Sequence, residues 1–340
     1  MSVLVTGGDG FVGQYLLREL LAAGADVVAS VQRLPPRPSI LERQEVDAAT
    51  WKQAEVLDAD TLFRLVASER PDLIVHLAGF SSGALARRAP GEALSLNAEG
   101  TLNLCASVGR VREEYPDYSP RILVMGSGDA YGSHTSEPLS EEMTLRPNSP
   151  YGLSKACQEQ VAHAFRRSHQ LDTVVARSFN LVGPGQAPHF AVPDFSLQVA
   201  AIAAGDVEPL LEVGNLDVER DFTDVRDAVR GLRVISQLET PSRAYNVCSG
   251  RAVSIRQLVE WILDEAEVEV EIRVVAERVR VEESPRIVGD PRLLERDTGW
   301  KPRRDLENSV RSVYRWARAA REKGGRTDTE RLEGEPWTLP

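Results

Sequence analysis

Residues Thr6-Gly7-Gly8-Asp9-Gly10-Phe11-Val12-Gly13 form a glycine-rich stretch near the start of the chain. The stretch follows the apolar run 3–5 and precedes leucines at helical spacing, so it joins a strand to a helix. Gly7 and Gly10 allow a tight turn whose backbone can approach a pyrophosphate, and Gly13 lets the helix pack closely on the strand. The amino end of the helix adds free amides and a positive dipole end. The stretch therefore predicts a dinucleotide-binding turn, whichever of its first two glycines begins the motif.

Further apolar runs of strand length alternate with helical patterns through the first half of the chain. These runs cover residues 26–31, 72–77, 121–125 and 173–176. Strands that are apolar on both faces and alternate with helices indicate a mostly parallel sheet covered on both sides. The sequence therefore predicts an α/β fold with a Rossmann-type doubly wound parallel sheet. After about residue 178 glycine and proline cluster, which indicates a smaller, interleaved C-terminal lobe.

This change of pattern sets the expected domain bounds. We expect residues 1–177, with a contribution from 216–248, to form an NAD(P)-binding Rossmann domain. Residues 178–215 and 249–320 are expected to form the substrate-binding lobe. Residues 321–340 show no apolar period, so we expect a flexible tail there.

The composition is that of a soluble, folded protein. The 340-residue chain is 42% hydrophobic and 27% charged, as is ordinary for a globular protein. Its formal net charge of -11 provides no basic field for a polyanion, so we expect neither nucleic acid nor an anionic membrane surface as a partner. The sequence has no basic leader and no run of about eighteen apolar residues, so a cytoplasmic location is expected.

The three cysteines are Cys105, Cys157 and Cys248. They are widely spaced, without a C-x-x-C pair and without histidines at ligand spacing. This pattern favours free thiols in a reducing compartment, and we expect no metal site.

The end of the second expected strand bears on the choice of cofactor. An acidic residue about 20 positions beyond the glycine turn typically binds the ribose hydroxyls of NAD. Ser30, Gln32 and Arg33 occupy that region instead. Arg33 can pair with a 2′-phosphate but cannot accept a hydrogen bond from a diol. The sequence thus favours NADP(H), with NAD(H) as the alternative and an unliganded surface arginine as the plainer interpretation of Arg33.

Tyr151 and Lys155 stand four residues apart, directly after Pro150, which suits the first position of a helix. This spacing places both side chains on one helix face. A phenol has a pKa of about 10, and a nearby ammonium lowers that pKa toward neutral pH, which suits proton transfer. The alternative is a solvated surface pair.

Ser127 ends the strand that begins at residue 121, and it is expected either to point into the ligand crevice or to cap the next turn.

Together these motifs resemble the extended short-chain dehydrogenase/reductases, in their nucleotide-sugar epimerase and dehydratase group. The resemblance spans about residues 1–320 and includes His76-Leu77-Ala78-Gly79 and Asn97. It implies Tyr151 as the acid/base, Lys155 as modulator of its pKa and as ribose anchor, Ser127 as partner of a carbonyl, and Asn97 as a helix residue that shapes the site. The cofactor-binding set that it implies is Gly7, Gly10, Phe11, Val12, Gly13, Arg33, Leu77, Ala78, Tyr151 and Lys155.

Later segments resemble the GDP-sugar branch of this group. Residues 177–186 resemble the loop that receives the substrate diphosphate, and 213–225 and 280–302 resemble segments that hold the nucleotide. Guanidinium groups suit phosphates, although each single arginine of this arginine-rich chain also fits a solvated charge. We expect Asp129 as a further catalytic residue, and substrate contacts from Ser81, Ser127, Asn180, Gln186, Asn215, Arg220, Arg280 and Glu283.

The resemblance implies NAD(P)H-dependent reduction of the 4-keto group of a GDP-4-keto-6-deoxyhexose, giving GDP-D-rhamnose (GDP-6-deoxy-D-mannose). A GDP-mannose 4,6-dehydratase is the main alternative, but it needs further acid/base groups, usually threonine and glutamate, where this chain has Ser127-Gly128-Asp129. A nucleotide-sugar 4-epimerase and a non-catalytic NAD(P)-binding sensor are two others. The resemblance also implies a homodimer formed through the helix that carries Tyr151 and the helix before it.

Overall fold

The computed structural model describes residues 1–134, 137–279 and 284–322. Its main feature is a seven-stranded sheet in which every neighbouring pair of strands is parallel. The order across the sheet is β10 (Ala244–Val247), β6 (Asp172–Ser178), β5 (Arg121–Ser127), β4 (Leu73–His76), β1 (Ser2–Thr6), β2 (Asp26–Val31) and β3 (Thr50–Gln53). The order runs outward in both directions from β1 and β4, as in a doubly wound sheet, so the predicted fold class is confirmed.

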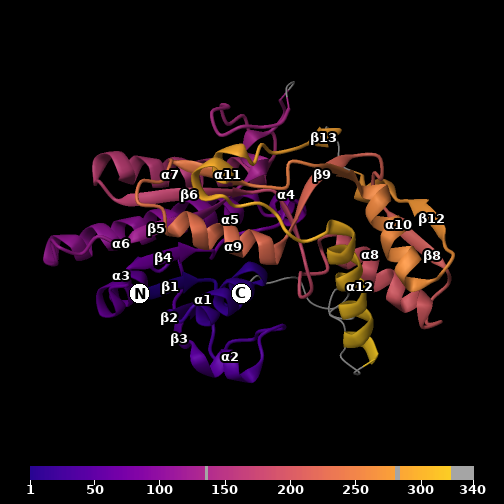
Figure 1. The fold of residues 1–340 in the computed structure, drawn as a ribbon, viewed down its shortest axis with the longest axis horizontal. Coiled ribbons are helices and arrows are strands. Elements are labelled where there is room, and N and C mark those ends of the chain that lie inside the picture. Colours follow the sequence, from indigo (N-terminus) through magenta and orange to yellow (C-terminus); the bar gives the residue numbers. More distant parts are fainter. Residues whose placement is uncertain (135–136, 280–283, 323–340) are drawn as a thin grey trace.

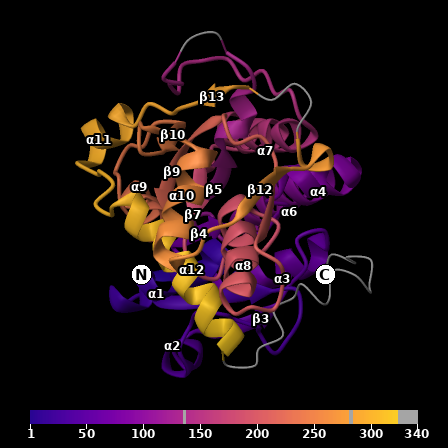
Figure 2. The ribbon, with the colours of Figure 1, turned by 90° about the vertical axis from the view of Figure 1, so that its right-hand side faces the viewer.

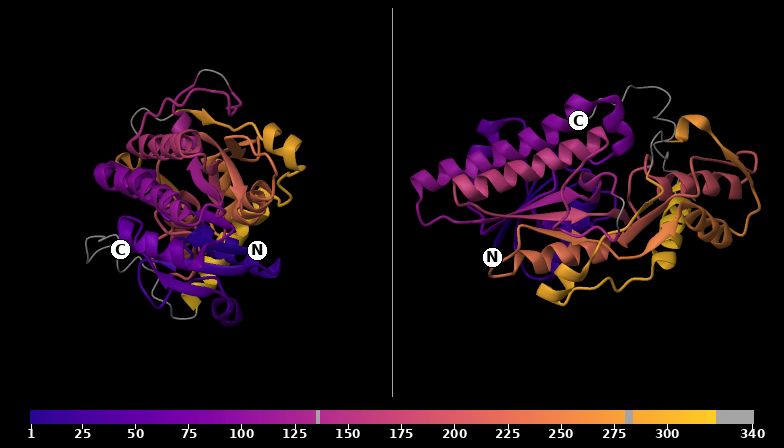
Figure 3. Two further views of the ribbon diagram at one scale, coloured as in Figure 1. Left: turned by 90° about the vertical axis from the view of Figure 1, so that its left-hand side faces the viewer. Right: turned by 90° about the horizontal axis from the view of Figure 1, so that it is seen from above.

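Helices cover both faces of this sheet. On one face lie α1 (Phe11–Ala22) and α9 (Val225–Ser236), and on the other lie α3 (Ala59–Glu69), α6 (Gly100–Glu114) and α7 (Pro150–Ser168). The right-hand view of Figure 3 shows α6 and α7 on one side of the sheet and α9 on the other. The strands are therefore shielded from water on both sides, which explains their continuous apolar character.

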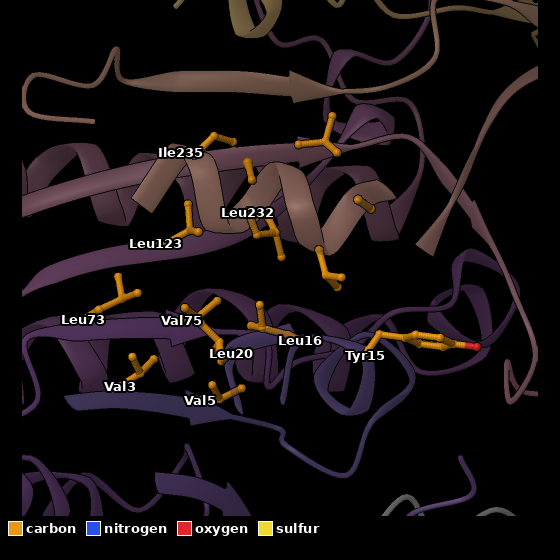
Figure 4. Close-up of a cluster of buried hydrophobic side chains, with 14 of the residues drawn as sticks. Val3, Val5, Tyr15, Leu16, Leu20, Leu73, Val75, Leu123, Leu232 and Ile235 are labelled. Atoms are coloured by element: carbon orange, nitrogen blue, oxygen red, sulfur yellow. The ribbon is translucent and has the colours of Figure 1, made fainter. Parts of the chain in front are cut away.

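Strand β1 shows how the two cores are divided. Val3 and Val5 pack toward α1 and α9, and Figure 4 shows them close to Leu16 and Leu20. Leu4, which points the other way, belongs to the second core beneath α3 and α6. Alternate residues of one strand thus enter opposite cores because successive side chains of a strand point to opposite faces.

A smaller lobe lies beside the carboxyl ends of the main strands (Figures 1 and 2). Its sheets combine β7 (Asn180–Val182), β9 (Glu219–Asp224), β11 (Ala252–Ser254) and β13 (Arg286–Ile287), and separately β8 (Leu210–Val213) and β12 (Glu271–Val274). Helices α8 (Ala191–Ala203), α10 (Ile255–Ala266) and α12 (Leu306–Glu322) enclose its apolar core. The chain crosses between the two parts here: β9 belongs to the smaller lobe, whereas α9 and β10, which follow it, pack on and extend the main sheet. The domain bounds predicted above stay a proposal, and most of the expected tail lies outside the described residues.

The remaining elements are short. They are α2 (Arg43–Ala48), α4 (Gly83–Arg88), α5 (Pro90–Leu94), η1 (Ser95–Glu99), η2 (Gly128–Tyr131), η3 (Ala276–Arg278) and α11 (Arg292–Thr298). The three cysteines are free thiols. Within the described ranges, no helix has both the length and the apolar character needed to cross a lipid bilayer.

A buried ion pair fastens α7 to β6. The Glu159 carboxylate accepts hydrogen bonds from Arg177, whose Nε lies 2.9 Å from Oε2, and from the His163 ring at 3.1 Å. Arg177 also donates to the Tyr131 hydroxyl at 2.6 Å. Burial alone raises the pKa of Glu159, but the hydrogen bonds from Arg177 and His163 outweigh it and lower the pKa to about 2. The pair fixes how α7 lies along the sheet.

Replacement of Glu159 by glutamine should reduce the free energy of unfolding by about 3 kcal/mol at pH 7, because it leaves the Arg177 guanidinium buried without its counter-charge. The pKa of Glu159 is lower in the folded chain than the value of about 4.3 in the unfolded one, so its stabilising contribution is present above that value. The contribution is lost as the pH falls toward about 2. Urea unfolding at a series of pH values measures this. If the free energy of unfolding differed between Glu159→Gln and the parent by the same amount at pH 7 and at pH 2, the assignment would be contradicted.

Candidate active site

The glycine stretch forms a closed turn between β1 and α1. Gly7 has a φ of 70°, in the left-handed region, and the N–H groups of Gly7 and Gly8 both donate to the Ser30 carbonyl at 3.0 Å. A Cβ on Gly13 would lie 2.2 Å from the Gly7 carbonyl oxygen. The amino end of α1 therefore packs directly on the turn and leaves no room for side chains there, and this cradle fits a dinucleotide pyrophosphate.

The end of β4 lies against the same turn. The Ala78 N–H donates to the Thr6 hydroxyl at 3.1 Å, and the Leu77 N–H donates to the Thr6 carbonyl at 3.3 Å. A Cβ on Gly7 would lie only 2.9 Å from the Ala78 nitrogen. Leu77 and Ala78 are thus beside the glycine turn, and Phe11 and Val12 are the first two residues of α1.

Arg33 follows β2, the neighbour of β1 in the sheet, and it is exposed. The side chain of Gln32 is held differently, since it donates to Glu55 at 2.8 Å. An exposed guanidinium at this edge of the turn is accessible to a 2′-phosphate.

Helix α7 begins at the centre of the site. Ser149 caps it by accepting a hydrogen bond from the Gly152 N–H at 3.0 Å. A Cβ on Gly152 would lie 2.4 Å from the Asp129 carbonyl oxygen, so the first turn of α7 packs tightly on η2. Tyr151 and Lys155 are buried here, with exposed fractions of 9% and 6%.

The two side chains meet alternate residues of β5. The Lys155 Nζ donates to the Met125 carbonyl at 3.0 Å and to the Gln158 side-chain oxygen at 2.9 Å. The Tyr151 phenol interacts with the hydroxyl of Ser127, two residues further along the strand. The strand therefore brings the serine, the phenol and the ammonium to one end of the sheet, where ligands of such folds bind.

Burial dominates the electrostatics of this pair. Burial raises the pKa of Tyr151, the charge of Asp129 raises it further, and the Ser127 hydroxyl lowers it, so the phenol stays protonated at neutral pH. Burial lowers the pKa of Lys155 to about 7. Burial and Asp129 dominate the pKa of Tyr151 in this structure, and the role of Lys155 as modulator of that pKa stays a prediction.

Ser127 has two roles in this geometry. Its hydroxyl accepts a hydrogen bond from the Asp129 N–H at 3.1 Å, which caps η2 as the alternative interpretation expected. It also acts on the Tyr151 phenol, and it is buried, with 8% of its surface exposed. Capping and contact with the phenol are compatible, since a hydroxyl can both accept and donate.

Asn97 lies in a π-helical turn between α5 and α6. Its side-chain oxygen accepts from the Phe80 N–H at 2.9 Å, and its amide nitrogen donates to the Phe80 carbonyl at 3.2 Å and to the Ser154 hydroxyl at 2.8 Å. Ser154 donates in turn to the Tyr151 carbonyl at 2.8 Å. Asn97 therefore joins the loop after β4 to the turn of α7 that carries Tyr151.

The predicted substrate-binding residues lie on several separate loops and strands. Ser81 is exposed in the loop before α4. Asn180 and Arg220 lie on the neighbouring strands β7 and β9, where Asn180 donates to the Asp221 carbonyl at 3.2 Å. The side-chain nitrogen of Gln186 donates to the Leu181 carbonyl of β7, and the side-chain oxygen of Asn215 accepts from the Asp217 N–H. The predicted contacts Arg280 and Glu283 lie outside the described residues.

One interpretation of the 177–186 segment changes. The sequence places Arg177 at the start of a loop that receives a diphosphate, but its guanidinium is buried and paired with Glu159 and Tyr131. The Arg177 guanidinium therefore binds interior side chains and does not face a substrate phosphate. Its partner Glu159 is distant in sequence, and the sequence alone offers no sign of the pairing.

Sequence reasoning also missed Gln158, which is buried and accepts a hydrogen bond from Lys155. Its position three residues after Lys155, on the same helix face, is the signal that points to it.

Comparisons with known proteins agree with this geometry. A family model described as GDP-mannose 4,6 dehydratase matches residues 4–313. GDP-6-deoxy-D-mannose reductase of Pseudomonas aeruginosa is 34% identical over 325 residues, which is 94% of this chain and 99% of the relative. GDP-6-deoxy-D-talose 4-dehydrogenase of Aggregatibacter actinomycetemcomitans is 29% identical over 300 residues, 86% of this chain and 90% of the relative.

A solved structure gives the same relation. The structure of RMD from Pseudomonas aeruginosa complexed with NADPH matches with a TM-score of 0.79 and 32% identity, over 94% of this chain and 99% of that one. The match extends over both the sheet and the smaller lobe. The chain therefore belongs to the GDP-mannose 4,6 dehydratase family, within the extended short-chain dehydrogenase/reductases that its motifs resemble.

Proposed function

We propose that the protein uses NADPH to reduce the 4-keto group of GDP-4-keto-6-deoxymannose, forming GDP-D-rhamnose. The observation that carries this proposal is the placement of Tyr151, which is buried beside Ser127 at the carboxyl end of β5, one helical turn before Lys155. The 34% identity to a GDP-6-deoxy-D-mannose reductase supports the choice of sugar nucleotide, and the NADPH complex of the structural relative supports the cofactor.

The glycine turn, Leu77, Ala78 and Lys155 would hold the cofactor, which supplies the hydride when bound. Ser127 donates a hydrogen bond to the carbonyl oxygen, which favours the negative charge that develops there. Tyr151 then transfers its phenolic proton to that oxygen. Lys155 keeps the buried end of the site positively polarised.

The raised pKa of Tyr151 suits the role of proton donor in a reduction. Reduction needs a phenol that holds a proton until an alkoxide forms, and burial together with the Asp129 charge raises the pKa of Tyr151 and preserves that proton. Dehydratases and 4-epimerases begin by removing a proton from a sugar hydroxyl, for which a phenolate is required.

The residues after Ser127 also count against a dehydratase. A Cβ on Gly128 would lie 3.1 Å from the Phe179 ring, so a side chain at this position would need that ring to move. Asp129 is the only acid in η2, and its charge acts on the Tyr151 phenol. We assign Asp129 to the electrostatics of Tyr151 rather than to the removal of water from the sugar.

We also propose a cytoplasmic homodimer that needs no nucleic-acid partner. Leu102 on α6 is 44% exposed and Leu153 on α7 is 50% exposed. The two helices pack side by side on one face of the sheet (Figure 3). Large apolar side chains on two adjacent helices suit burial against a second copy of the same surface.

The reaction is tested with GDP-4-keto-6-deoxymannose and NADPH. We expect the absorbance of NADPH to fall in proportion to a product two hydrogens heavier than the substrate, as measured by mass spectrometry. Tyr151→Phe should reduce turnover by more than about a thousandfold while NADPH binding, followed by its fluorescence, is retained. Turnover within tenfold of the parent would refute the role of Tyr151.

GDP-mannose serves as the matched substrate control. Loss of water from it without use of NADPH would identify a dehydratase. An isomer of unchanged mass would identify an epimerase, and no reaction with either sugar would favour the sensor.

Arg33→Ala should weaken NADPH binding by about tenfold or more and leave NADH binding nearly unchanged, because only NADPH carries the 2′-phosphate. Titration of cofactor fluorescence with both nucleotides measures the two affinities. Equal losses for NADPH and NADH would remove Arg33 from the 2′-phosphate site.

Sedimentation equilibrium tests the homodimer, with an expected mass of twice the 37.4 kDa of one chain. Leu153→Glu should shift the protein toward the monomer, because it would bury a charge without a partner in the proposed interface. A parent protein that is monomeric at micromolar concentration would contradict this proposal.

A further inference from the structure

A continuous run of buried hydrogen bonds connects Lys155 to the strand that leads into the glycine turn. Lys155 donates to the Gln158 side-chain oxygen at 2.9 Å, and Gln158 donates to the Thr101 hydroxyl at 3.0 Å. The Nε2 atom of His76 lies 3.1 Å from the same hydroxyl, and its Nδ1 lies 2.8 Å from the Thr6 hydroxyl. None of the five side chains is more than 6% exposed. The run links α7, α6, β4 and β1.

The direction of every bond in this run follows from proton counting. Thr101 has one hydroxyl proton, which it donates to the Asn97 carbonyl at 2.7 Å. It can therefore only accept from Gln158 and His76. Neutral His76 must carry its proton on Nε2, and Nδ1 accepts the proton of Thr6, a tautomer assigned from the network.

This arrangement fixes Gln158 in one orientation. Its amide nitrogen must face Thr101, which has no proton left to give, and its oxygen must therefore face Lys155. The Lys155 ammonium can only donate hydrogen bonds, so it requires the oxygen of the Gln158 amide and not the nitrogen. The Met125 carbonyl is the second acceptor of Lys155, at 3.0 Å.

We propose that Gln158 is a positioning residue of the active site, which holds the Lys155 ammonium in place and supports its charge, with Thr101 and His76 fixing the orientation of the amide. The inference rests on the proposed function for its role in reduction. The contacts that carry it are independent of that function.

Few charged groups compete with Gln158 for this role. From β4, His76 faces the run and is neutral, because burial and, to a smaller extent, the charge of Lys155 lower its pKa to about 3. From β5 the acceptor is a backbone carbonyl. On α7 itself, Tyr151 is protonated and Glu159 is paired with Arg177. Among the described residues, Gln158 is therefore the side chain that hydrogen-bonds the ammonium.

The test measures the pKa of Lys155 by carbon-13 NMR, in the protein without substrate or cofactor. The sequence contains only four lysines, so carbon-13 label at Cε gives few signals, and the signal missing from Lys155→Arg is that of Lys155. Gln158→Met retains the length of the side chain and removes the acceptor. We expect it to lower the pKa of Lys155 by about one pH unit or more, since hydrogen bonds to charged groups contribute about that much.

Two further variants keep the result interpretable. Gln158→Glu restores an acceptor oxygen and adds a negative charge, so the pKa of Lys155 should rise above that of the parent. Gln237→Met makes the same replacement at an exposed position after α9 and should leave the pKa unchanged. Equal Lys155 titration in the parent, Gln158→Met and Gln158→Glu would overturn the inference.

The reductase assay then gives a second readout. In Gln158→Met the high-pH limb of kcat should move to lower pH, in step with the Lys155 titration, while KM for the sugar nucleotide changes less than threefold. A uniform loss of kcat at all pH values, with an unchanged Lys155 titration, would reduce Gln158 to a structural role. If the parent itself does not reduce the sugar, the proposed function fails while the titration still tests the inference.

Discussion

Removal of water from Tyr151 and Lys155 at the carboxyl end of β5 is the constraint on which the site depends. A buried ammonium needs oxygen acceptors, and the Met125 carbonyl and Gln158 provide them. A buried phenol resists ionisation, so Tyr151 keeps its proton. The site is therefore organised to give a proton to a developing alkoxide, which is the requirement of carbonyl reduction.

The fold provides this environment through close packing at a few positions. The π-helical turn aims Asn97 at the Phe80 backbone and at Ser154, which fixes the first turn of α7. The ion pair between Glu159 and Arg177 fixes the next turns of the same helix. The parallel sheet brings the glycine turn to the same edge, so cofactor and proton donor share one crevice.

The fold and the centre of the site were predictable from the sequence because their signals are local. The glycine stretch, the apolar strands and the spacing of Tyr151 and Lys155 each lie within one element. The protonation of the pair was not predictable, because it depends on burial that tertiary packing creates. The ion pair between Arg177 and Glu159 was also not predictable, because the two residues lie 18 positions apart on different elements and meet only through tertiary packing.

A Tyr151 that acts as proton donor must hold its phenolic proton, and carbon-13 NMR of the tyrosine Cζ atoms measures its ionisation. The chain has seven tyrosines, and the signal absent from Tyr151→Phe belongs to Tyr151. We expect this signal to remain that of a neutral phenol up to and beyond the usual tyrosine pKa of about 10. Ionisation of Tyr151 near neutral pH would contradict this expectation.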